Sequence, residues 1–173
     1  MIELVITGAA GAIGSETVSL LLTKKKFRIF AIDSDEQKLE LLAKRFQKEI
    51  ESAHLTLIKS ELPDYRSCLE IVKSIPGGTS RLIHLAGLNL VDANSYDNED
   101  VWEIVINSNL KTAYLMAGAV LENRNKSYPI RMVFTSSIAY RRGSFDSLIY
   151  SIAKAGVVGL TRSMAKRVGS EGL

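Results

Sequence analysis

The sequence predicts an α/β fold: a doubly wound parallel sheet in three α/β/α layers. Short runs rich in Val, Ile, Leu and Phe alternate with longer segments whose apolar residues recur at helical spacing, and a glycine-rich stretch joins the first run to the first helical segment. Strands that alternate with helices of ten or more residues indicate βαβ units, whose helices cover both faces of a sheet. No repeat, low-complexity segment or linker interrupts the 173 residues, which predicts one domain over 1–173.

The elements of the N-terminal half follow in order. Strands are predicted at 2–7, 27–32 and 54–58, each followed by a helix, at 12–25, 35–50 and 63–75. The Pro-Gly-Gly sequence at 76–78 ends the third helix, because proline cannot continue it and glycine favours a turn.

The C-terminal half repeats the alternation with longer helices. An apolar run at 81–87 is predicted as a buried strand, and 130–136 as the fifth strand. A polar loop over 89–98 precedes a long helix at 99–123, and the last predicted helix covers 148–168.

The composition indicates a folded protein without a metal or disulfide framework. With 46% hydrophobic and 24% charged residues, the chain can bury one sizeable core. The single cysteine, Cys68, excludes an intrachain disulfide and is expected to pack a helix. His54 and His84 stand far apart and unaccompanied, so we predict no metal site.

Charge and hydropathy argue against two classes of partner. The net charge of +3 comes from scattered lysines and arginines, and the short runs at 24–26 and 141–142 are typical of solvated helix ends. The opening stretch MIELVITG lacks a basic region leading into an apolar one, and no stretch approaches the roughly 18 uninterrupted apolar residues of a membrane helix. We expect a cytoplasmic protein that binds neither nucleic acid nor membrane.

The turn after the first strand reads TGAAGAIG. Its glycines, Gly8, Gly11 and Gly14, permit a sharp turn, a close approach of the backbone to a pyrophosphate, and tight helix packing. The helix that opens there, at Ala12 and Ile13, directs N–H groups and its positive dipole end at an anion. A glycine cluster alone also fits a purely structural turn, but its place between strand and helix predicts a dinucleotide site.

Asp33 ends the second strand, where a carboxylate can accept hydrogen bonds from both ribose hydroxyls and repel a 2′-phosphate. No arginine or lysine stands in the few residues after it to meet such a phosphate. The pattern favours NAD over NADP as cofactor. The alternative is a helix N-cap, a role that Ser34 or Asp35 could fill equally well.

Tyr150 and Lys154, in the stretch YSIAKAG, stand at positions i and i+4 of a predicted helix and share one face. A lysine ammonium beside a phenol lowers the phenol's pKa from about 10, as a general acid/base for an alcohol or carbonyl requires. Ser137 ends the fifth strand, at the sheet edge where open parallel sheets bind ligands, and could bond the same substrate oxygen. A capping or turn role for Ser137 or its neighbour Ser136 stays open.

These motifs together resemble the short-chain dehydrogenase/reductase family, over the whole chain. The family's T-G-x-x-x-(A/G)-x-G turn is matched at 7–14, and its N-N-A-G strand end is partly matched by HLAG at 84–87. Its helix asparagine is matched by Asn109 in INSNLKTAY, and its serine, tyrosine and lysine by Ser137, Tyr150 and Lys154. The resemblance implies a Rossmann-like, dinucleotide-binding domain.

The resemblance also implies a role for each matched residue. Tyr150 would be the catalytic acid/base, Lys154 would bind the nicotinamide ribose and lower the tyrosine pKa, Ser137 would orient the substrate, and Asn109 would hold a proton-relay water. The cofactor would also contact the glycine turn, Asp33, and the strand end at Ala86 and Gly87. Glu61 stands at the position of a family aspartate that often contacts adenine.

Two departures leave alternatives open. His84 and Leu85 replace the family's asparagine pair, and the glycine spacing also fits the sugar-nucleotide branch of the family, although the tyrosine helix resembles the oxidoreductase branch. For His84 itself, a hydrogen-bonded core position is favoured over a ligand contact. The sequence also ends at GSEGL, where the family would supply two further strands and a substrate-binding segment, so we expect those to be absent from it. A fragment, an ordered portion of a longer protein and a naturally short protein stay open as explanations.

The predicted function is therefore NAD-dependent hydride transfer between a secondary alcohol and a ketone, on a small-molecule substrate. A sugar-nucleotide epimerase or dehydratase and a non-catalytic NAD-binding module are the alternatives. The fifth strand would be left as an exposed edge that proteins normally cover. The family commonly pairs the Asn109 and Tyr150 helices between subunits, which implies a homodimer or homotetramer.

Overall fold

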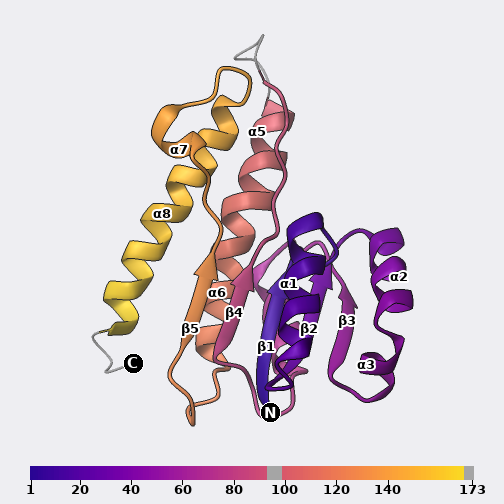
Figure 1. Ribbon diagram of the computed structural model, residues 1–173. Coiled ribbons are helices and arrows are strands. Elements are labelled where there is room, and N and C mark those ends of the chain that lie inside the picture. The colour runs from indigo at the N-terminus through magenta and orange to yellow at the C-terminus, as the bar shows by residue number, and fades with distance from the viewer. Residues whose placement is uncertain (93–98, 170–173) are drawn as a thin grey trace. The chain divides into compact units, whose positions relative to one another are not determined.

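The computed structural model describes residues 1–92 and 99–169 (Figure 1). Its sheet has five strands in the order β3-β2-β1-β4-β5, and β1 pairs in parallel with both β2 and β4. The strands are β1 (Ile2–Thr7), β2 (Phe27–Asp33), β3 (Leu55–Lys59), β4 (Arg81–His84) and β5 (Arg131–Phe134). Because the chain starts at the centre of the sheet and moves first to one side and then to the other, the predicted doubly wound α/β class is confirmed.

The helices lie between the strands, as the sequence pattern predicts. They are α1 (Ala12–Thr23), α2 (Glu36–Arg45), α3 (Gln47–Glu51), α4 (Tyr65–Lys73), α5 (Glu99–Ile106), the π-helical turn η1 (Asn107–Lys111), α6 (Thr112–Glu122), α7 (Ala139–Arg142) and α8 (Leu148–Gly169). The predicted polar loop at 89–98 and the final GSEGL fall partly outside the described residues, at 93–98 and 170–173.

The described chain forms two compact units. The first comprises residues 1–86 and 115–133, and contains the sheet, α1 to α4 and most of α6. The second comprises 87–114 and the chain from 134 onward, and contains α5, η1, α7 and α8. The single domain expected over 1–173 stays a prediction.

The core of the first unit is built on the central strands. Leu4, Ile6, Ile29, Ala31 and Leu55 are buried in one cluster, which explains why these strands read as continuous apolar runs rather than alternating ones. Helix α1 packs on β1 and β2 in front of the sheet, and α6 lies behind it (Figure 1).

Cys68 on α4 is fully buried in this unit, as expected for a helix-packing residue. Burial raises the pKa of its thiol to about 11, because the interior disfavours the charged thiolate.

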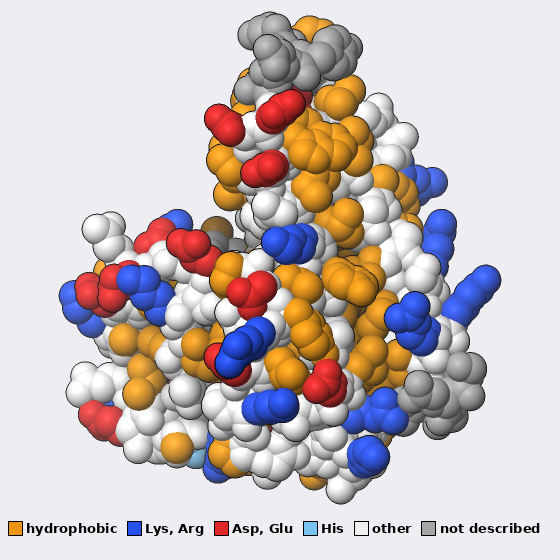
Figure 2. Space-filling model, turned by 180° about the vertical axis from the view of Figure 1, so that it is seen from behind, with side chains coloured by type: hydrophobic (Ala, Val, Ile, Leu, Met, Phe, Trp, Pro, Cys, Tyr) orange, Lys and Arg blue, Asp and Glu red, His pale blue; other side chains and the backbone are white. Residues whose placement is uncertain are grey.

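The second unit is organised around the contact of α5 with α8. Val105 of α5 and Ile149 and Ala153 of α8 are buried together, with Tyr150 packed against them. Charged side chains lie at two helix ends: Glu99 and Asp100 are in the first turn of α5, near which Figure 2 shows acidic side chains gathered, and Lys166 and Arg167 are in the last turn of α8. These signs complement the helix dipoles.

The helix from Glu99 to Glu122 is long and apolar enough to cross a membrane by length and composition alone. Half of its most apolar window is buried inside the fold, as in a helix that covers a protein core.

Two predicted helices are interrupted in the structure. The helix expected at 35–50 breaks at Phe46, whose backbone leaves the helical region (φ −124°, ψ 37°) while its ring packs on the core of the first unit and lies 5.0 Å from the Arg45 guanidinium carbon. The helix expected at 99–123 contains the π-helical turn at Asn107–Lys111. At Phe46 and at the π-helical turn, the backbone therefore departs from the regular α-helix that the spacing of apolar residues predicts.

The predicted strands at 81–87 and 130–136 are shorter than expected. Strand β4 ends at His84; Leu85 still donates its N–H to the carbonyl oxygen of Thr7 at 3.0 Å, and the backbone turns at Gly87, where φ is 152°. Strand β5 ends at Phe134, and the next two residues bond to α8 instead of to a strand: Thr135 through its carbonyl oxygen and Ser136 through its hydroxyl. Helix α7 was not predicted. As expected, β5 is an edge of the described sheet.

Candidate functional site

The glycine turn of the first unit is fixed by close backbone approaches. Gly8 has φ +65°, and a Cβ there would lie 2.6 Å from the backbone nitrogen of Ala86. A Cβ on Gly14 would lie 2.0 Å from the carbonyl oxygen of Gly8. Neither position admits a side chain, so two of the three glycines are required by the turn itself.

The third glycine leaves the start of α1 open. Gly11 is the N-cap residue, and no side chain caps the helix among the described residues. A Cβ on Gly11 would meet only the Gly8 oxygen, at the ordinary distance of 3.4 Å. Ala12 and Ile13, the first residues of α1, are exposed. An uncapped helix start with an open glycine in front of it fits the pyrophosphate of a dinucleotide.

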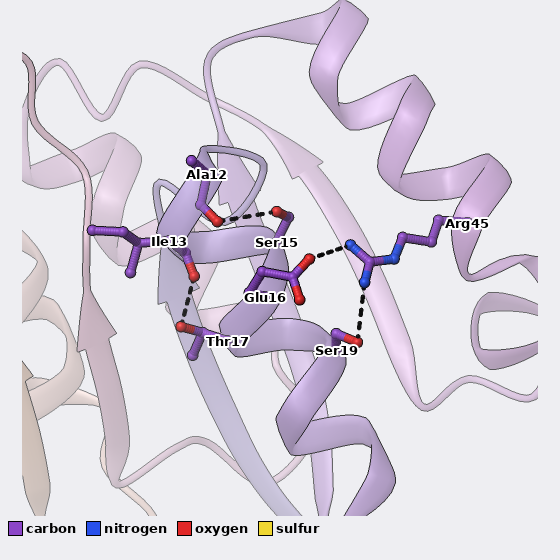
Figure 3. Close-up of polar contacts among 7 residues, drawn as sticks. All are labelled: Ala12, Ile13, Ser15, Glu16, Thr17, Ser19 and Arg45. Carbon is purple, nitrogen blue, oxygen red and sulfur yellow. Dashed lines mark hydrogen bonds and ion pairs between the residues drawn. The ribbon is translucent and has the colours of Figure 1, made fainter.

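Helix α1 is held by polar contacts farther along its length (Figure 3). The hydroxyl of Thr17 donates to the carbonyl oxygen of Ile13 at 2.8 Å. Arg45 of α2 bonds Glu16 at 2.6 Å and Ser19 at 3.3 Å, and its hydrogen bond lowers the pKa of the Glu16 carboxyl. The Arg45 contacts tie α1 to α2, and none of these contacts uses a backbone N–H group at the helix start.

Asp33 lies at the end of β2 and supports the same turn. One carboxylate oxygen accepts the N–H of Ala10 at 2.9 Å, and the other accepts the N–H of Asp35 at 3.1 Å. Each oxygen keeps a further lone pair for a ribose hydroxyl. The N-cap of α2 is Asp35, which accepts the N–H of Lys38, so the capping alternative for Asp33 does not hold. Glu61 follows β3 and is exposed.

His84 is a hydrogen-bonded core residue, as favoured from the sequence. It is 2% exposed, and its Nδ1 lies 2.8 Å from the hydroxyl oxygen of Thr7. The same hydroxyl accepts the N–H of Ala86 at 3.4 Å. Thr7 therefore connects the end of β1 to the end of β4, next to the glycine turn.

In the second unit, α8 places Lys154 against Tyr150. The ammonium nitrogen lies 5.4 Å from the centroid of the tyrosine ring and donates to the carbonyl oxygen of Thr135 at 3.0 Å. Lys154 is only 5% exposed, and burial lowers its pKa. Tyr150 is half-buried. A desolvated cation beside a phenol is a suitable arrangement for proton transfer.

Asn109 lies within the π-helical turn and is buried. Its amide nitrogen donates to the carbonyl oxygens of Leu88 at 2.7 Å and Val105 at 2.9 Å, while its Oδ1 is a buried atom with no hydrogen-bond partner among the described residues. A Cβ on Gly87 would lie 2.3 Å from this oxygen and 3.5 Å from the Lys154 ammonium nitrogen. Gly87 thus lets the backbone pass between two candidate site residues.

The two serines after β5 have different contacts. Ser136 donates its hydroxyl to the backbone oxygen of Lys154 at 2.9 Å, which ties the strand end to α8. The Ser137 hydroxyl accepts the N–H of Ala139 at 3.2 Å, so it supports the turn into α7, as the capping alternative anticipated. Its own proton stays available for a substrate oxygen.

The structure therefore brings the predicted residues together in two sets. The first unit contains Gly8, Gly11, Ala12, Ile13, Gly14, Asp33, Glu61 and Ala86, and the second contains Gly87, Asn109, Ser137, Tyr150 and Lys154. Sequence reasoning missed Thr135, because a backbone carbonyl that bonds the lysine leaves no mark in the residue types.

The chain belongs to the short chain dehydrogenase family, whose model matches residues 3–173. This match confirms the identification made from the motifs, and with it the oxidoreductase class. The prediction made from the turn, the strand end and the tyrosine helix therefore holds at the level of the family.

Several of the relatives in this family are named as reductases. The chain is 26% identical over 168 residues to the 3-oxoacyl-(acyl-carrier-protein) reductase FabG of Vibrio harveyi. The aligned region covers 97% of this chain and 68% of that protein. It is 26% identical to the acetoacetyl-CoA reductase of an Acinetobacter species, over 93% of this chain and 66% of that protein. These names favour the oxidoreductase expectation over the sugar-nucleotide alternative.

Solved structures share the fold. The crystal structure of a short chain dehydrogenase/reductase family oxidoreductase from Burkholderia thailandensis matches with a TM-score of 0.85 at 23% identity, over 99% of this chain and 65% of that one. The chain thus spans about two thirds of the length of the relatives it matches.

The close approach at Gly14 predicts a large effect of one methyl group. We expect Gly14→Ala to lower the free energy of unfolding by about 3 kcal/mol, because the new Cβ collides with the backbone of the turn. In Gly159→Ala, on α8, the Cβ meets nothing within 4 Å among the described residues, and we expect no loss or a gain of about 1 kcal/mol. Urea denaturation measures both; equal stability of the two variants would contradict the prediction.

The burial of Lys154 predicts a pH dependence of stability. Its pKa is lowered from 10.5 in the folded chain, so the unfolded chain holds the proton to higher pH, and the free energy of unfolding rises with pH between the lowered pKa and 10.5. We expect Lys154→Met to lack this rise. Urea denaturation of both chains at several pH values up to 10.5 tests it, and parallel stability curves would refute it.

Proposed function

We propose that the chain is an NAD-dependent oxidoreductase that transfers a hydride between nicotinamide and a secondary alcohol or ketone, with Tyr150 as the acid/base. The observation that carries this proposal is the buried Lys154 ammonium, 5.4 Å from the centroid of the Tyr150 ring. Burying a cation costs free energy. Beside the Tyr150 ring, its charge can assist proton transfer by stabilising the phenolate. The whole of 1–173 would act as one dinucleotide-binding domain.

The proposed roles follow from the donors and acceptors of each side chain. In reduction, the Tyr150 hydroxyl donates its proton to the carbonyl oxygen of the substrate; in oxidation, the phenolate takes the proton of the alcohol. Lys154 stabilises the phenolate by its charge. Ser137 donates its free proton to the same substrate oxygen, and Asn109 Oδ1 accepts from a water of a proton relay.

Each of the two sets has proposed roles in cofactor binding. The start of α1 at Gly11, Ala12 and Ile13 would hold the pyrophosphate. Asp33 would hold the adenosine ribose, with Glu61 toward the adenine. Ala86, Gly87, Tyr150 and Lys154 would contact the nicotinamide half. When bound, the nicotinamide supplies or accepts the hydride.

The substrate class is suggested by the relatives. The FabG enzymes and the acetoacetyl-CoA reductase are named for 3-oxoacyl thioesters, so we propose a small-molecule ketone of this kind as the first substrate to test. A cytoplasmic location and a homodimer or homotetramer complete the proposal.

The contacts of Asp33 predict the cofactor preference. We expect the chain to bind NADH more tightly than NADPH, and Asp33→Asn to reduce this preference about tenfold, because the amide keeps an oxygen for the Ala10 N–H but no longer repels a 2′-phosphate. A fluorescence titration of both chains with both cofactors measures the ratio. An unchanged ratio in Asp33→Asn would remove Asp33 from the cofactor site.

The role of Tyr150 predicts the outcome of removing one oxygen atom. We expect Tyr150→Phe to reduce turnover of acetoacetyl-CoA with NADH by about 10³-fold while NADH still binds, because the ring is kept and only the proton donor is lost. The absorbance of NADH reports turnover. Undiminished turnover in Tyr150→Phe would exclude this acid/base. Cofactor binding by the unaltered chain without turnover would favour the non-catalytic module.

A further inference from the structure

We propose that Asp92 is a positioning residue for the reaction, because its carboxylate holds the first turn of α8 and thereby fixes Tyr150. The inference rests on the proposed function of Tyr150. Asp92 belongs to none of the family motifs matched in the sequence, and all the residues involved lie within the second unit.

Both carboxylate oxygens of Asp92 bind the start of α8. One accepts the backbone N–H of Leu148 at 2.9 Å and the other that of Ile149 at 2.8 Å. In addition, the backbone N–H of Asp92 donates to the carbonyl oxygen of Asp146 at 2.9 Å. Three hydrogen bonds therefore join Asp92 to the two residues that open α8 and to the turn just before them.

The origin of this cap is unusual. The first N–H groups of a helix have no partner within the helix, and the residue immediately before the first turn normally supplies one. Here the acceptor is 56 and 57 positions away in the sequence. Because the acceptor is a charged carboxylate, these hydrogen bonds are stronger than neutral ones. The negative charge also lies at the positive end of the helix dipole, which stabilises it further.

Tyr150 is the next residue after Ile149, so it lies in the turn that Asp92 holds. An uncapped first turn tends to fray, and fraying would move the Tyr150 side chain. Without Asp92, the phenol would be positioned less precisely relative to a bound substrate, because only its packing on the apolar cluster and its contact with Lys154 would remain.

The segment Leu88–Asp92, here called the strap, links two candidate site residues. The carbonyl oxygen of Leu88 accepts the amide N–H of Asn109, and Leu90 packs on the apolar cluster that Tyr150 also contacts. At its other end, Asp92 holds the start of α8. The strap therefore connects the π-helical turn that carries Asn109 to the first turn that carries Tyr150.

The first test observes Tyr150 directly and needs no substrate. Tyrosine labelled with carbon-13 at Cζ gives one signal for each of the six tyrosines, and Tyr150→Phe identifies its own. We expect Asp92→Ala to shift or broaden the Tyr150 signal, and Asp92→Asn, which keeps one acceptor oxygen, to change it less. Should Asp92→Ala fail to fold, the Asp92→Asn spectrum decides.

The matched control removes a cap of the same type elsewhere. Asp64 is the N-cap of α4 in the first unit and accepts the N–H of Ser67 at 2.8 Å. We expect Asp64→Ala to lose stability, as any lost cap does, but to leave the Tyr150 signal in place. An unchanged Tyr150 signal in Asp92→Ala would overturn the proposal.

The second test measures catalysis. With acetoacetyl-CoA and NADH, we expect Asp92→Ala to lower kcat about 10²-fold through misplacement of Tyr150, with partial rescue in Asp92→Asn and no loss in Asp64→Ala. The KM for NADH should change by no more than about threefold, because Tyr150 is the only proposed cofactor contact that lies in this turn. A full kcat in Asp92→Ala would overturn the proposal. If the unaltered chain does not turn over, the proposed function fails, and the Tyr150 signal alone decides the role of Asp92.

Discussion

The close approach of the β1 turn to the end of β4 is the constraint on which the first unit depends. Gly8 leaves no room for a Cβ against Ala86, and Thr7 bonds both His84 and the Ala86 N–H. These contacts fix where α1 starts and where the chain leaves β4 toward Gly87. One small residue and one buried hydroxyl thus set the positions of the glycine turn and of the strand end that accompanies it.

Sequence patterns predicted the order and type of the main elements because periodicity and turn residues are local properties. They failed where tertiary contacts override the period. Phe46 interrupts a regular helical pattern in order to pack on the core, and the π-helical turn around Asn109 has no signature in residue spacing. The short helix α7 was missed because four residues are too few to show a period.

The candidate residues were predictable for a similar reason, since their types and spacing match a family motif. The contacts that position them were not. Lys154 is held by a backbone carbonyl, Asn109 by the carbonyls of Leu88 and Val105, and α8 by a carboxylate from a distant loop. Such partners come together only when the chain folds, and their residue types alone do not distinguish them from ordinary loop residues.

The reactivity of Cys68 can report local opening of the first unit around α4. Only the thiolate reacts with alkylating agents and oxidants, and a fully buried thiol with a pKa of about 11 offers almost none at neutral pH. Because the chain has a single cysteine, any thiol modification of it can be assigned to this one position on α4. Oxidation of Cys68 would thus depend on how often α4 opens as well as on how much oxidant is present.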